Sequence, residues 1–270
     1  MTKVPARPTG VVLVFWFTGS LLLAFIVVPL IGLAISQSTG HLARVAAMPD
    51  VRLAILLSLL AALLTAGCAA LLGVPLAYVL ARTEFRGKEI VTAIVDLPLA
   101  VPHTVAGIAL LIVFGRQGMI GGPAGALFGL RFWGTLAGVV VGMLFVAAPY
   151  TVNAAQIGFE AVDPRLEKVA RTLGMGPWHV LLRVTLPLAW RSIVIGLTLT
   201  YARAISEFAA VAILAYYPMT APVKIYELFL QFGLDESSAM ALLLLVVSLA
   251  LFILFRHIGH RRIVLVGAGR

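Results

Sequence analysis

The sequence is poor in charge and has a single cysteine. Asp, Glu, Lys and Arg make up 11% of its 270 residues, whereas charged residues make up about 25% of a typical soluble domain. Apolar residues make up 61%, are spread along the whole chain and give a mean hydropathy of +1.07. Cys68 lies inside an apolar run with no second thiol to pair with, which excludes a disulfide framework and a cysteine-based metal site. This composition predicts an integral membrane protein with lipid around its apolar side chains.

Motifs for binding ATP, nucleic acid or metal are also missing. The only Gly-Lys pair, Gly87-Lys88, lacks the upstream glycine and the following hydroxyl of a phosphate-binding loop, so the chain is not expected to bind ATP by that route. The net charge of +9 does not indicate a nucleic-acid partner, because the basic residues are scattered between apolar runs. No second His or Cys stands at ligand spacing from His103, and no nucleophile with a base is apparent. We therefore expect no catalytic residue, no metal and no cofactor on this chain.

Six segments are long enough to cross a bilayer, which takes about 20 mostly apolar residues. Four carry no charge: Val11 to Ser36, Leu53 to Ala81, Phe132 to Phe159 and Ser237 to Phe255. Two carry charge: Ile90 to Gly115 contains Asp96, and Ser192 to Tyr217 contains Arg203 and Glu207. The pattern predicts an all-α membrane protein with six transmembrane helices.

Lys and Arg are divided unequally between the two sides of this topology. If the N-terminus is cytoplasmic, fourteen lie on the cytoplasmic side: Lys3, Arg7, Arg82, Arg86, Lys88, Arg165, Lys168, Arg171, Arg183, Arg191, Arg256, Arg261, Arg262 and Arg270. Five lie on the other side: Arg44, Arg52, Arg116, Arg131 and Lys224. Because cytoplasmic segments are enriched in Lys and Arg, we expect a multi-pass protein of the cell membrane with both termini cytoplasmic. The outer loop from Arg116 to Arg131 is rich in glycine, which suits a tight connection more than a phosphate cradle.

The longest polar stretch, Glu160 to Arg191, is patterned as a short amphipathic helix. Asp163 followed by Pro164 is typical of a helix start. Gly174 can end the helix with a left-handed cap, and Pro187 is expected to break the chain before the fifth span. Apolar residues recur at i, i+3, i+4 and i+7, with basic residues elsewhere around the helix; they are Leu166, Val169, Ala170 and Leu173 against Arg165, Lys168 and Arg171. This pattern alone fits a helix on the membrane surface as well as one docked on a protein.

The same stretch carries a recognisable motif. Gly174, nine further residues and then Val184-Thr185-Leu186-Pro187 resemble the G-x(9)-[IV]-x-L-P core of the cytoplasmic motif in permease subunits of type I ABC importers. The Glu-Ala-Ala that opens the motif corresponds to Lys168-Val169-Ala170, with the acid displaced to Glu167. Residues 159–166 and 170–174 are similar to the molybdate and tungstate permeases in particular, as are residues 96–98, 102–107, 202–208 and 216–227. The resemblance runs from about Leu53 to Phe255.

The resemblance implies a channel without ATPase activity of its own. The chain would form a homodimer driven by two cytoplasmic ATP-binding cassette subunits, which would hold ATP and Mg, and would be supplied by an extracytoplasmic molybdate- or tungstate-binding protein. The helix from Pro164 to Leu173 would be the coupling helix, seated in a groove of the ATPase. The residues expected to serve coupling are Glu160, Ala161, Asp163, Pro164, Arg165, Leu166, Glu167, Ala170, Arg171, Leu173, Gly174, Leu186 and Pro187.

Charges and prolines within the spans are candidates for the translocation path. Arg203 and Glu207 are four residues apart and share one helix face, where pairing offsets much of the cost of about 2.5 to 3.5 kcal/mol for each charge at mid-bilayer. The pair is either a structural pair or an element of the path or gate. The prolines disfavour a straight third span, which either shapes packing or lines the path entrance. The residues expected at the path or gate are Pro98, Pro102, His103, Thr104, Arg203, Ser206 and Glu207.

One membrane domain in three parts is predicted. Residues 1–52 hold the N-terminal tail, the first span and an outer loop, residues 53–256 form the permease core, and residues 257–270 form a short cytoplasmic tail. Gly67, Gly73 and Gly107 are expected to allow close contact between helices. The expected function is to form the path for molybdate or tungstate, with sulfate or another oxyanion as the nearest alternative. An ion-coupled secondary transporter, with Arg203 and Glu207 as a proton-coupled site, is the alternative from another class.

Overall fold

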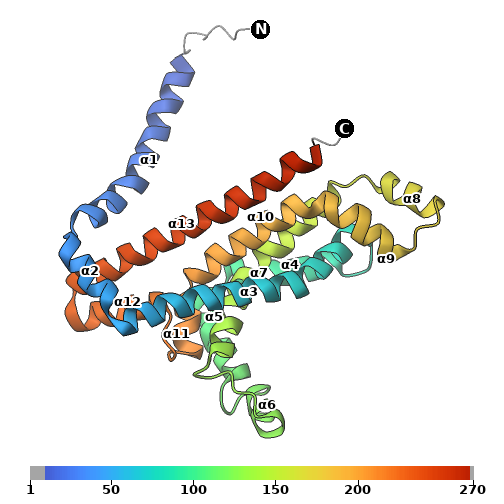
Figure 1. The fold of residues 1–270 in the computed structure, drawn as a ribbon. Helices are drawn as coiled ribbons and strands as arrows, with labels where there is room; N and C mark the ends of the chain where they lie inside the picture. Colours follow the sequence, from blue (N-terminus) through green and yellow to red (C-terminus); the bar gives the residue numbers. More distant parts are fainter. Residues whose placement is uncertain (1–9, 268–270) are drawn as a thin grey trace.

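The regular structure of the chain is helical throughout (Figure 1). The computed structural model describes the backbone of residues 10–267 and the side chains of residues 10–254, and no strand occurs within that part. The helices are α1 (Gly10–Ile35), α2 (Thr39–Ala47), α3 (Pro49–Arg82), α4 (Lys88–Ala100), α5 (His103–Phe114), α6 (Gly121–Phe128), α7 (Leu136–Glu160), α8 (Pro164–Thr172), α9 (Pro177–Val180), the π-helical η1 (Leu181–Thr185), α10 (Leu186–Ile205), α11 (Ala209–Leu214), α12 (Ala221–Phe232) and α13 (Leu234–Gly267). The predicted all-α fold is confirmed. The ends of both predicted tails, residues 1–9 and 268–270, lie outside the described residues.

Five helical segments in the described part are long and apolar enough to cross a bilayer, and α4 with α5 forms a sixth if the bent pair counts as one span. The five are α1, α3, α7, the continuous segment Pro177–Ile205 and α13. They correspond to the predicted spans, with some differences in extent. The helix of the sixth span does not end at Phe255, because α13 continues to Gly267 through most of the predicted C-terminal tail.

The third span is interrupted far more sharply than a kinked helix. α4 and α5 meet at an angle of 114° across Val101 and Pro102. Val101 is extended, with φ −79° and ψ 130°, as expected for a residue whose helical conformation is disfavoured by the proline after it. Pro98 lies within α4 and does not break it. The predicted span from Ile90 to Gly115, in which the prolines were expected to disfavour a straight helix, is therefore two helices pointing in different directions.

The fifth span differs from the prediction at both of its ends. It begins at Pro177 instead of the predicted Ser192, and it ends at Ile205 instead of the predicted Tyr217. Pro187 does not break the chain, because the widened π-helical turn of η1 precedes it and carries the helix into α10. A wider turn removes the clash between the proline ring and the preceding turn that a regular α-helix would produce. The actual break falls after Ile205, and the short helix α11 follows it.

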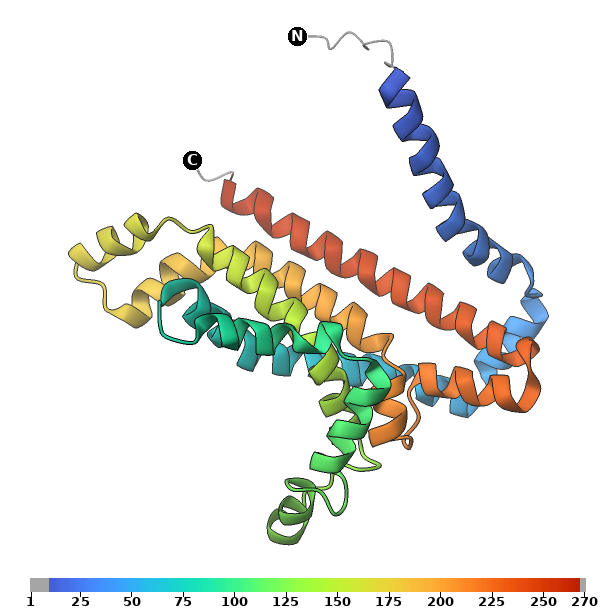
Figure 2. The ribbon, with the colours of Figure 1, turned by 180° about the vertical axis from the view of Figure 1, so that it is seen from behind.

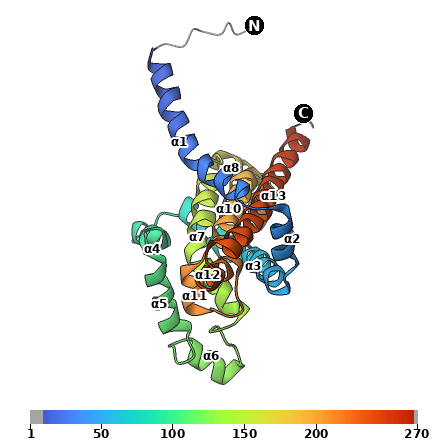
Figure 3. The ribbon, with the colours of Figure 1, turned by 90° about the vertical axis from the view of Figure 1, so that its left-hand side faces the viewer.

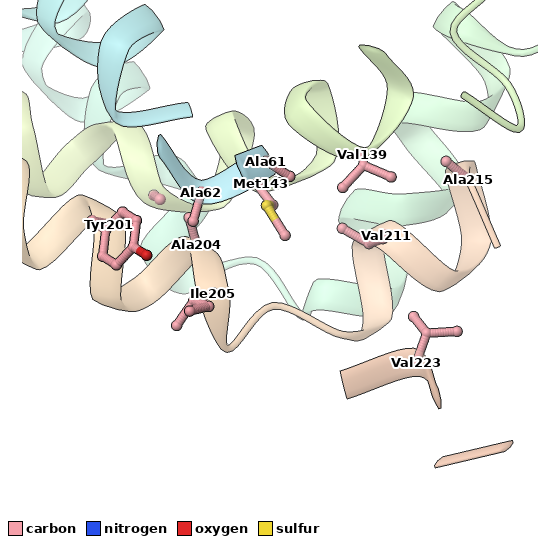
Figure 4. Close-up of a cluster of buried hydrophobic side chains, with 11 residues drawn as sticks. Ala61, Ala62, Val139, Met143, Tyr201, Ala204, Ile205, Val211, Ala215 and Val223 are labelled. Atoms are coloured by element: carbon pink, nitrogen blue, oxygen red, sulfur yellow. The ribbon is translucent and has the colours of Figure 1, made fainter. Parts of the chain in front are cut away.

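Three long helices, α3, α7 and α10, pack together at the centre of the bundle. Small side chains dominate one buried cluster between them, shown in Figure 4, where Ala61, Ala62 and Ala204 surround Met143. A second cluster lies nearer to α8 and centres on Phe159, whose ring meets Tyr78 edge to face at 5.4 Å. Small residues permit close approach of helix backbones, which drives helix association in a bilayer.

The two ends of the bundle differ in shape. Figures 1 and 2 show α8 at one end, beyond the ends of α7 and α10, and α2 with α12 at the other. α1 begins, and α13 ends, on the side away from α2 and α12. Figure 3 shows α5 and α6 extending out from the bundle and α1 standing apart from it. No side chain of α1 is buried in the chain itself, so this apolar helix needs lipid or another chain as cover.

A partly buried cation stabilises the end that carries α2 and α12. Lys224 Nζ lies 2.7 Å from both Asp50 Oδ2, at the start of α3, and Glu227 Oε2, within α12. Burial of Lys224 works to lower its pKa, but the hydrogen bonds to Asp50 and Glu227 outweigh this effect and raise the pKa above its ordinary value. Lys224 therefore stays charged at neutral pH, and the stabilisation it provides would be lost only as the pH rises through this raised pKa.

Glycines mark the closest helix contacts, in partial agreement with the prediction. A Cβ on Gly73 would lie 3.1 Å from Val152 of α7, and one on Gly107 would lie 2.9 Å from Ile213 of α11, so both allow close packing as predicted. The prediction is wrong for Gly67, where a Cβ would meet nothing within 4 Å in the described chain. A tighter place is Gly196 of α10, where a Cβ would lie 2.8 Å from Ala154 Cβ and 3.0 Å from the carbonyl oxygen of Tyr150, both in α7.

We predict that Gly196→Ala lowers the thermal unfolding temperature of the detergent-solubilised protein. The added methyl group would push α10 from α7, and overpacking of this kind costs about 1 to 3 kcal/mol. Gly67→Ala is the matched control, because it makes the same change in a helix facing open space and adds only the favourable helix propensity of alanine. An equal unfolding temperature for both variants would contradict the close contact between α7 and α10.

Candidate coupling segment and translocation path

The helix α8 begins and ends as the sequence predicts. Asp163 is its N-cap and accepts a hydrogen bond from the Arg165 backbone N–H at 2.9 Å, and Pro164 occupies the first helical position. At the other end Gly174 has a φ of +84°, in the left-handed region. The Met175 N–H donates to the Ala170 carbonyl and the Gly174 N–H to the Arg171 carbonyl, which is the hydrogen-bond pattern of a Schellman cap. These two caps fix the length of α8 and the direction in which the chain leaves it.

The predicted apolar stripe of α8 faces away from the bundle. Leu166, Val169 and Leu173 are 49%, 56% and 78% exposed, whereas Ala170 is buried. Their basic neighbours, Arg165, Lys168 and Arg171, are exposed as well. Trp178 of α9 adds a further exposed apolar side chain, at 74%. The end of the molecule that carries α8 thus presents an apolar face with basic residues beside it, without cover in the described chain.

A partly buried ion pair attaches α8 to the bundle. Glu167 is 6% exposed; its Oε1 atom lies 2.9 Å from the guanidinium group of Arg82 and accepts a hydrogen bond of 2.9 Å from Thr185. Arg82 also donates to the Val162 carbonyl, just before α8, at 2.9 Å. Because Arg82 is the last residue of α3 and Thr185 the last of η1, one carboxylate connects α8 to two central helices. The displaced acid of the motif is the residue that makes this attachment.

The other residues expected in coupling lie around this attachment without joining it. Glu160 ends α7 and accepts a hydrogen bond from Gln156, and Ala161 follows as the exposed C-cap. Leu186 packs against the buried cluster around Phe159. Pro187 is exposed in the first turn of α10.

Four of the residues expected at the path come together where two helices break. Arg203 Nη2 lies 2.8 Å from Glu207 Oε2, as predicted for the pair, although Glu207 stands beyond the end of α10 rather than within a helix. His103, the first residue of α5, lies 3.0 Å from Glu207 Oε2 and 3.0 Å from Arg203 Nη2. Ser206 accepts a hydrogen bond of 3.3 Å from Arg203. The other oxygen of Glu207 accepts from the Ala210 N–H at 3.0 Å, so this carboxylate, 2% exposed, is fully occupied.

The three remaining path candidates do not enter this group. Pro102 precedes His103 as the N-cap of α5, Thr104 is exposed beside it, and Pro98 lies in the last turn of α4. Asp96 of α4 instead accepts a hydrogen bond of 2.7 Å from Asn153 of α7. This bond ties α4 to α7 just ahead of the break at Val101.

Residues 73–264 match the family described as the binding-protein-dependent transport system inner membrane component. The match covers more than half of the chain. The chain belongs to this family. Relatives in the family are also similar over most of their length. A protein of Thermococcus kodakarensis named as a molybdate/tungstate transport system permease is 43% identical over 246 residues, covering 90% of this chain and 94% of that protein. A probable sulfate transport system permease of Chlorokybus atmophyticus is 34% identical, covering 88% and 85%.

The fold agrees with solved structures of the same kind. The crystal structure of a bacterial ABC transporter involved in the import of the acidic polysaccharide alginate superposes with a TM-score of 0.69 at 19% identity, covering 92% of this chain and 96% of that one. At this identity the likeness concerns the fold alone. It confirms the predicted fold class of a type I importer permease. Together with the family match, the apolar helices identify the chain as a multi-pass membrane protein and a transport permease subunit.

Several residues of these sites carried no signal in the sequence. Arg82 was recognised only as a loop charge, and Thr185 only as a motif position, so their contact with Glu167 was not predicted. His103 was expected near the path, but its contact with the Arg203 and Glu207 pair depends on the bend at Pro102. Asn153 lies in an apolar run, where an amide among small residues indicates a buried partner without identifying it.

We predict that Glu207→Gln lowers the yield of folded, assembled protein in size-exclusion chromatography more than Arg203→Gln does. Breaking a buried pair costs about 3 to 5 kcal/mol, and less here because the Arg203 side chain is 22% exposed. Removing Glu207 leaves Arg203 without a carboxylate, whereas removing Arg203 leaves Glu207 with His103. The double variant should assemble better than Glu207→Gln alone, because no lone charge remains.

The exposed pair of Glu84 and Lys88, with the same spacing of four residues, is the control for this experiment, and its double replacement should change little. A double Arg203 and Glu207 variant that assembles worse than Glu207→Gln would contradict the pairing. Uptake by the assembled double variant then separates the two roles: normal uptake assigns the pair to structure, and lost uptake assigns it to the path.

Proposed function

We propose that this chain is the permease subunit of an ATP-driven importer that carries molybdate or tungstate into the cell. The family assignment and the permease fold support the importer class. The substrate rests on the name of the Thermococcus relative, which shares 43% of aligned residues with this chain. The observation that carries the mechanism is the outward-facing apolar face of α8, on a helix fixed by Glu167 to the bundle.

The partners of the proposed importer follow from this face. α8 and Trp178 would dock in a groove of a cytoplasmic ATP-binding cassette subunit, which binds ATP and Mg in place of this chain. Exposed leucine and valine side chains bind by apolar burial, and the three basic residues of α8 offer partners to carboxylates around the groove. Two such subunits are needed because the permease is proposed to act as a homodimer. The exposed apolar surface of α1 is consistent with a second copy as well as with lipid.

The proposed orientation has α8 and both termini on the cytoplasmic side of the membrane. In the topology predicted from the sequence, fourteen of the Lys and Arg residues outside the predicted spans lie on the cytoplasmic side and five on the other side, and positive charge favours the cytoplasmic side. An extracytoplasmic oxyanion-binding protein would then deliver its cargo to the face opposite α8. Arg203 and His103, at the two helix breaks, would meet the dianion within the membrane.

The substrate is tested by ATP hydrolysis in the reconstituted complex with its binding protein. We expect molybdate or tungstate to stimulate hydrolysis at a concentration at least tenfold below that needed for sulfate. Tetrahedral dianions differ little in charge, so the discrimination rests largely on the binding protein. Equal responses to the three anions would contradict the assignment of molybdate or tungstate as the substrate. They would favour the sulfate alternative, which the Chlorokybus relative supports. The absence of any copurifying ATPase would contradict the importer class itself.

The coupling role of α8 is tested at Gly174. We predict that Gly174→Val abolishes copurification of the ATPase, or the stimulation of hydrolysis by loaded binding protein, while membrane insertion of the dimer is unchanged. A Cβ at Gly174 would meet nothing within 4 Å, so the effect would come from backbone strain alone, because a β-branched residue strongly disfavours φ of +84°.

Gly176→Val is the matched control for this variant. Gly176 stands two residues further on, with φ −67°, and its Cβ would make only an ordinary contact of 3.9 Å with His179. It should therefore retain coupling. Wild-type ATPase retention and uptake in Gly174→Val would show that α8 merely rests on the membrane surface.

A further inference from the structure

A cavity of about 500 Å³ lies where α5, α6 and the start of α7 come together. Arg116, two residues after α5, and Arg131, three residues after α6, line it from the two ends of the glycine-rich loop. Gly121 and Gly122 at the start of α6 and the ring of Trp133 complete much of its wall. The loop predicted to be a tight connection thus holds a helix and encloses a cavity, which we name the arginine cavity. It belongs to the face opposite α8, because α7 runs from this loop toward α8 (Figure 3).

The arginine cavity carries positive charge without compensation. No Asp or Glu occurs in the sequence between Asp96 and Glu160, a range that includes the whole loop. Neither guanidinium group has a hydrogen bond or an ion pair to any residue whose side chain is described. Both arginines are exposed, so an anion can reach them from solvent.

The other basic residues of this face all have partners. Arg44 lies 2.7 Å from the ring of His41, Arg52 donates to the Ala46 carbonyl, and Lys224 pairs with two carboxylates. Arg44 lines a second cavity, of about 470 Å³, together with Asp235 and Glu236. The acids there balance the arginine and repel anions. Within the described part of this face, two cations without a carboxylate partner line the same cavity only at the arginine cavity.

We propose that the arginine cavity binds a tetrahedral oxyanion dianion when the binding protein releases it. This inference rests on the proposed function. A guanidinium group presents a planar fork of N–H donors that matches paired oxygens, and two such forks supply the two charges of the dianion. The volume admits the anion with water around it, since a water molecule occupies roughly 30 Å³.

The position and exposure of the cavity suit transfer rather than storage. α5 has 12 residues and therefore spans about 18 Å at 1.5 Å per residue. It begins at His103, beside Arg203, and ends next to Arg116. The arginine cavity and the charged group at the helix breaks thus lie at opposite ends of one helix. Solvent around both arginines weakens their attraction, and weak binding allows the anion to leave for the path.

The test measures tungstate binding by the purified permease and ATPase complex in phosphatidylcholine nanodiscs, without binding protein. We expect saturable binding that weakens at high salt. Arg116→Gln and Arg131→Gln should each reduce the affinity about tenfold or more, the loss typical of one charge-assisted hydrogen bond. Arg44→Gln removes the same charge from the same face and should leave binding unchanged. Any tungstate held by the ATPase subunits persists in every variant and cancels in the comparison.

Equal tungstate affinity in wild type and both cavity variants would overturn the proposal. A second arm uses nanodiscs containing phosphatidylglycerol: if the cavity variants lose bound phospholipid while tungstate binding is unaltered, lipid phosphate occupies the cavity and the proposal fails. The stimulated ATPase assay separates this outcome from a failure of the proposed function. If ATP hydrolysis is stimulated normally but the Arg116 and Arg131 variants bind tungstate as the wild type does, only the proposed cavity site is contradicted. If ATP hydrolysis is not stimulated at all, the proposed importer function is contradicted, whatever the cavity binds.

Discussion

A helix that breaks within a bilayer leaves backbone groups that no water molecule can satisfy, and this constraint governs where the chain departs from straight helices. In the described part, the breaks after α4 and after α10 lie together and share one carboxylate. Glu207 accepts the N–H of Ala210 at the start of α11 and also contacts Arg203 of α10 and His103 of α5. The carboxylate of Glu207, which is costly to place in lipid, thus accepts a hydrogen bond from a backbone N–H that the break after α10 leaves without a helical partner. Movement of either break must disturb the other.

A continuous helix links this group to the coupling end. Thr185, which donates to Glu167, lies in the segment that runs unbroken from Pro177 to Ile205, and Arg203 lies near the end of that segment. Glu167 also pairs with Arg82 at the end of α3, and α3 and α10 pack on the same central helix, α7. A displacement of α8 would therefore move two packed helices at once. The ion pair of Glu167 with Arg82 and the rigid helices connect α8 to the helix breaks. A surface helix on a flexible loop would lack such a connection, and this favours the proposed coupling role over simple contact with lipid.

Local signals in the sequence predicted the parts of the structure that depend on neighbouring residues. Asp163, Pro164 and Gly174 fix both ends of α8 through backbone preferences that any context would respect, and the long apolar runs identify the spans. The sequence was misleading where tertiary packing overrides such preferences. Pro187 predicts a break in the helix, yet a π-helical turn accommodates it. Gly67 and Gly73 both predict a close helix contact, although of the two only Gly73 faces another helix. The contacts of Glu167 with Arg82 and of His103 with Glu207 join residues 85 and 104 positions apart, a distance over which helix periodicity carries no information.

The charges along the proposed route differ in a way that suits passage of an anion. In the group at the helix breaks, the carboxylate of Glu207 is paired with the guanidinium group of Arg203 and balances its charge. Such a group can offer guanidinium donors to a passing dianion without holding it tightly, because any approach must compete with the carboxylate already in place. The arginine cavity has no competing carboxylate, yet its two arginines are open to water and to salt screening. Attraction is thus concentrated where solvent weakens it and is cancelled where the membrane would make it strong, so at neither place would a dianion be trapped.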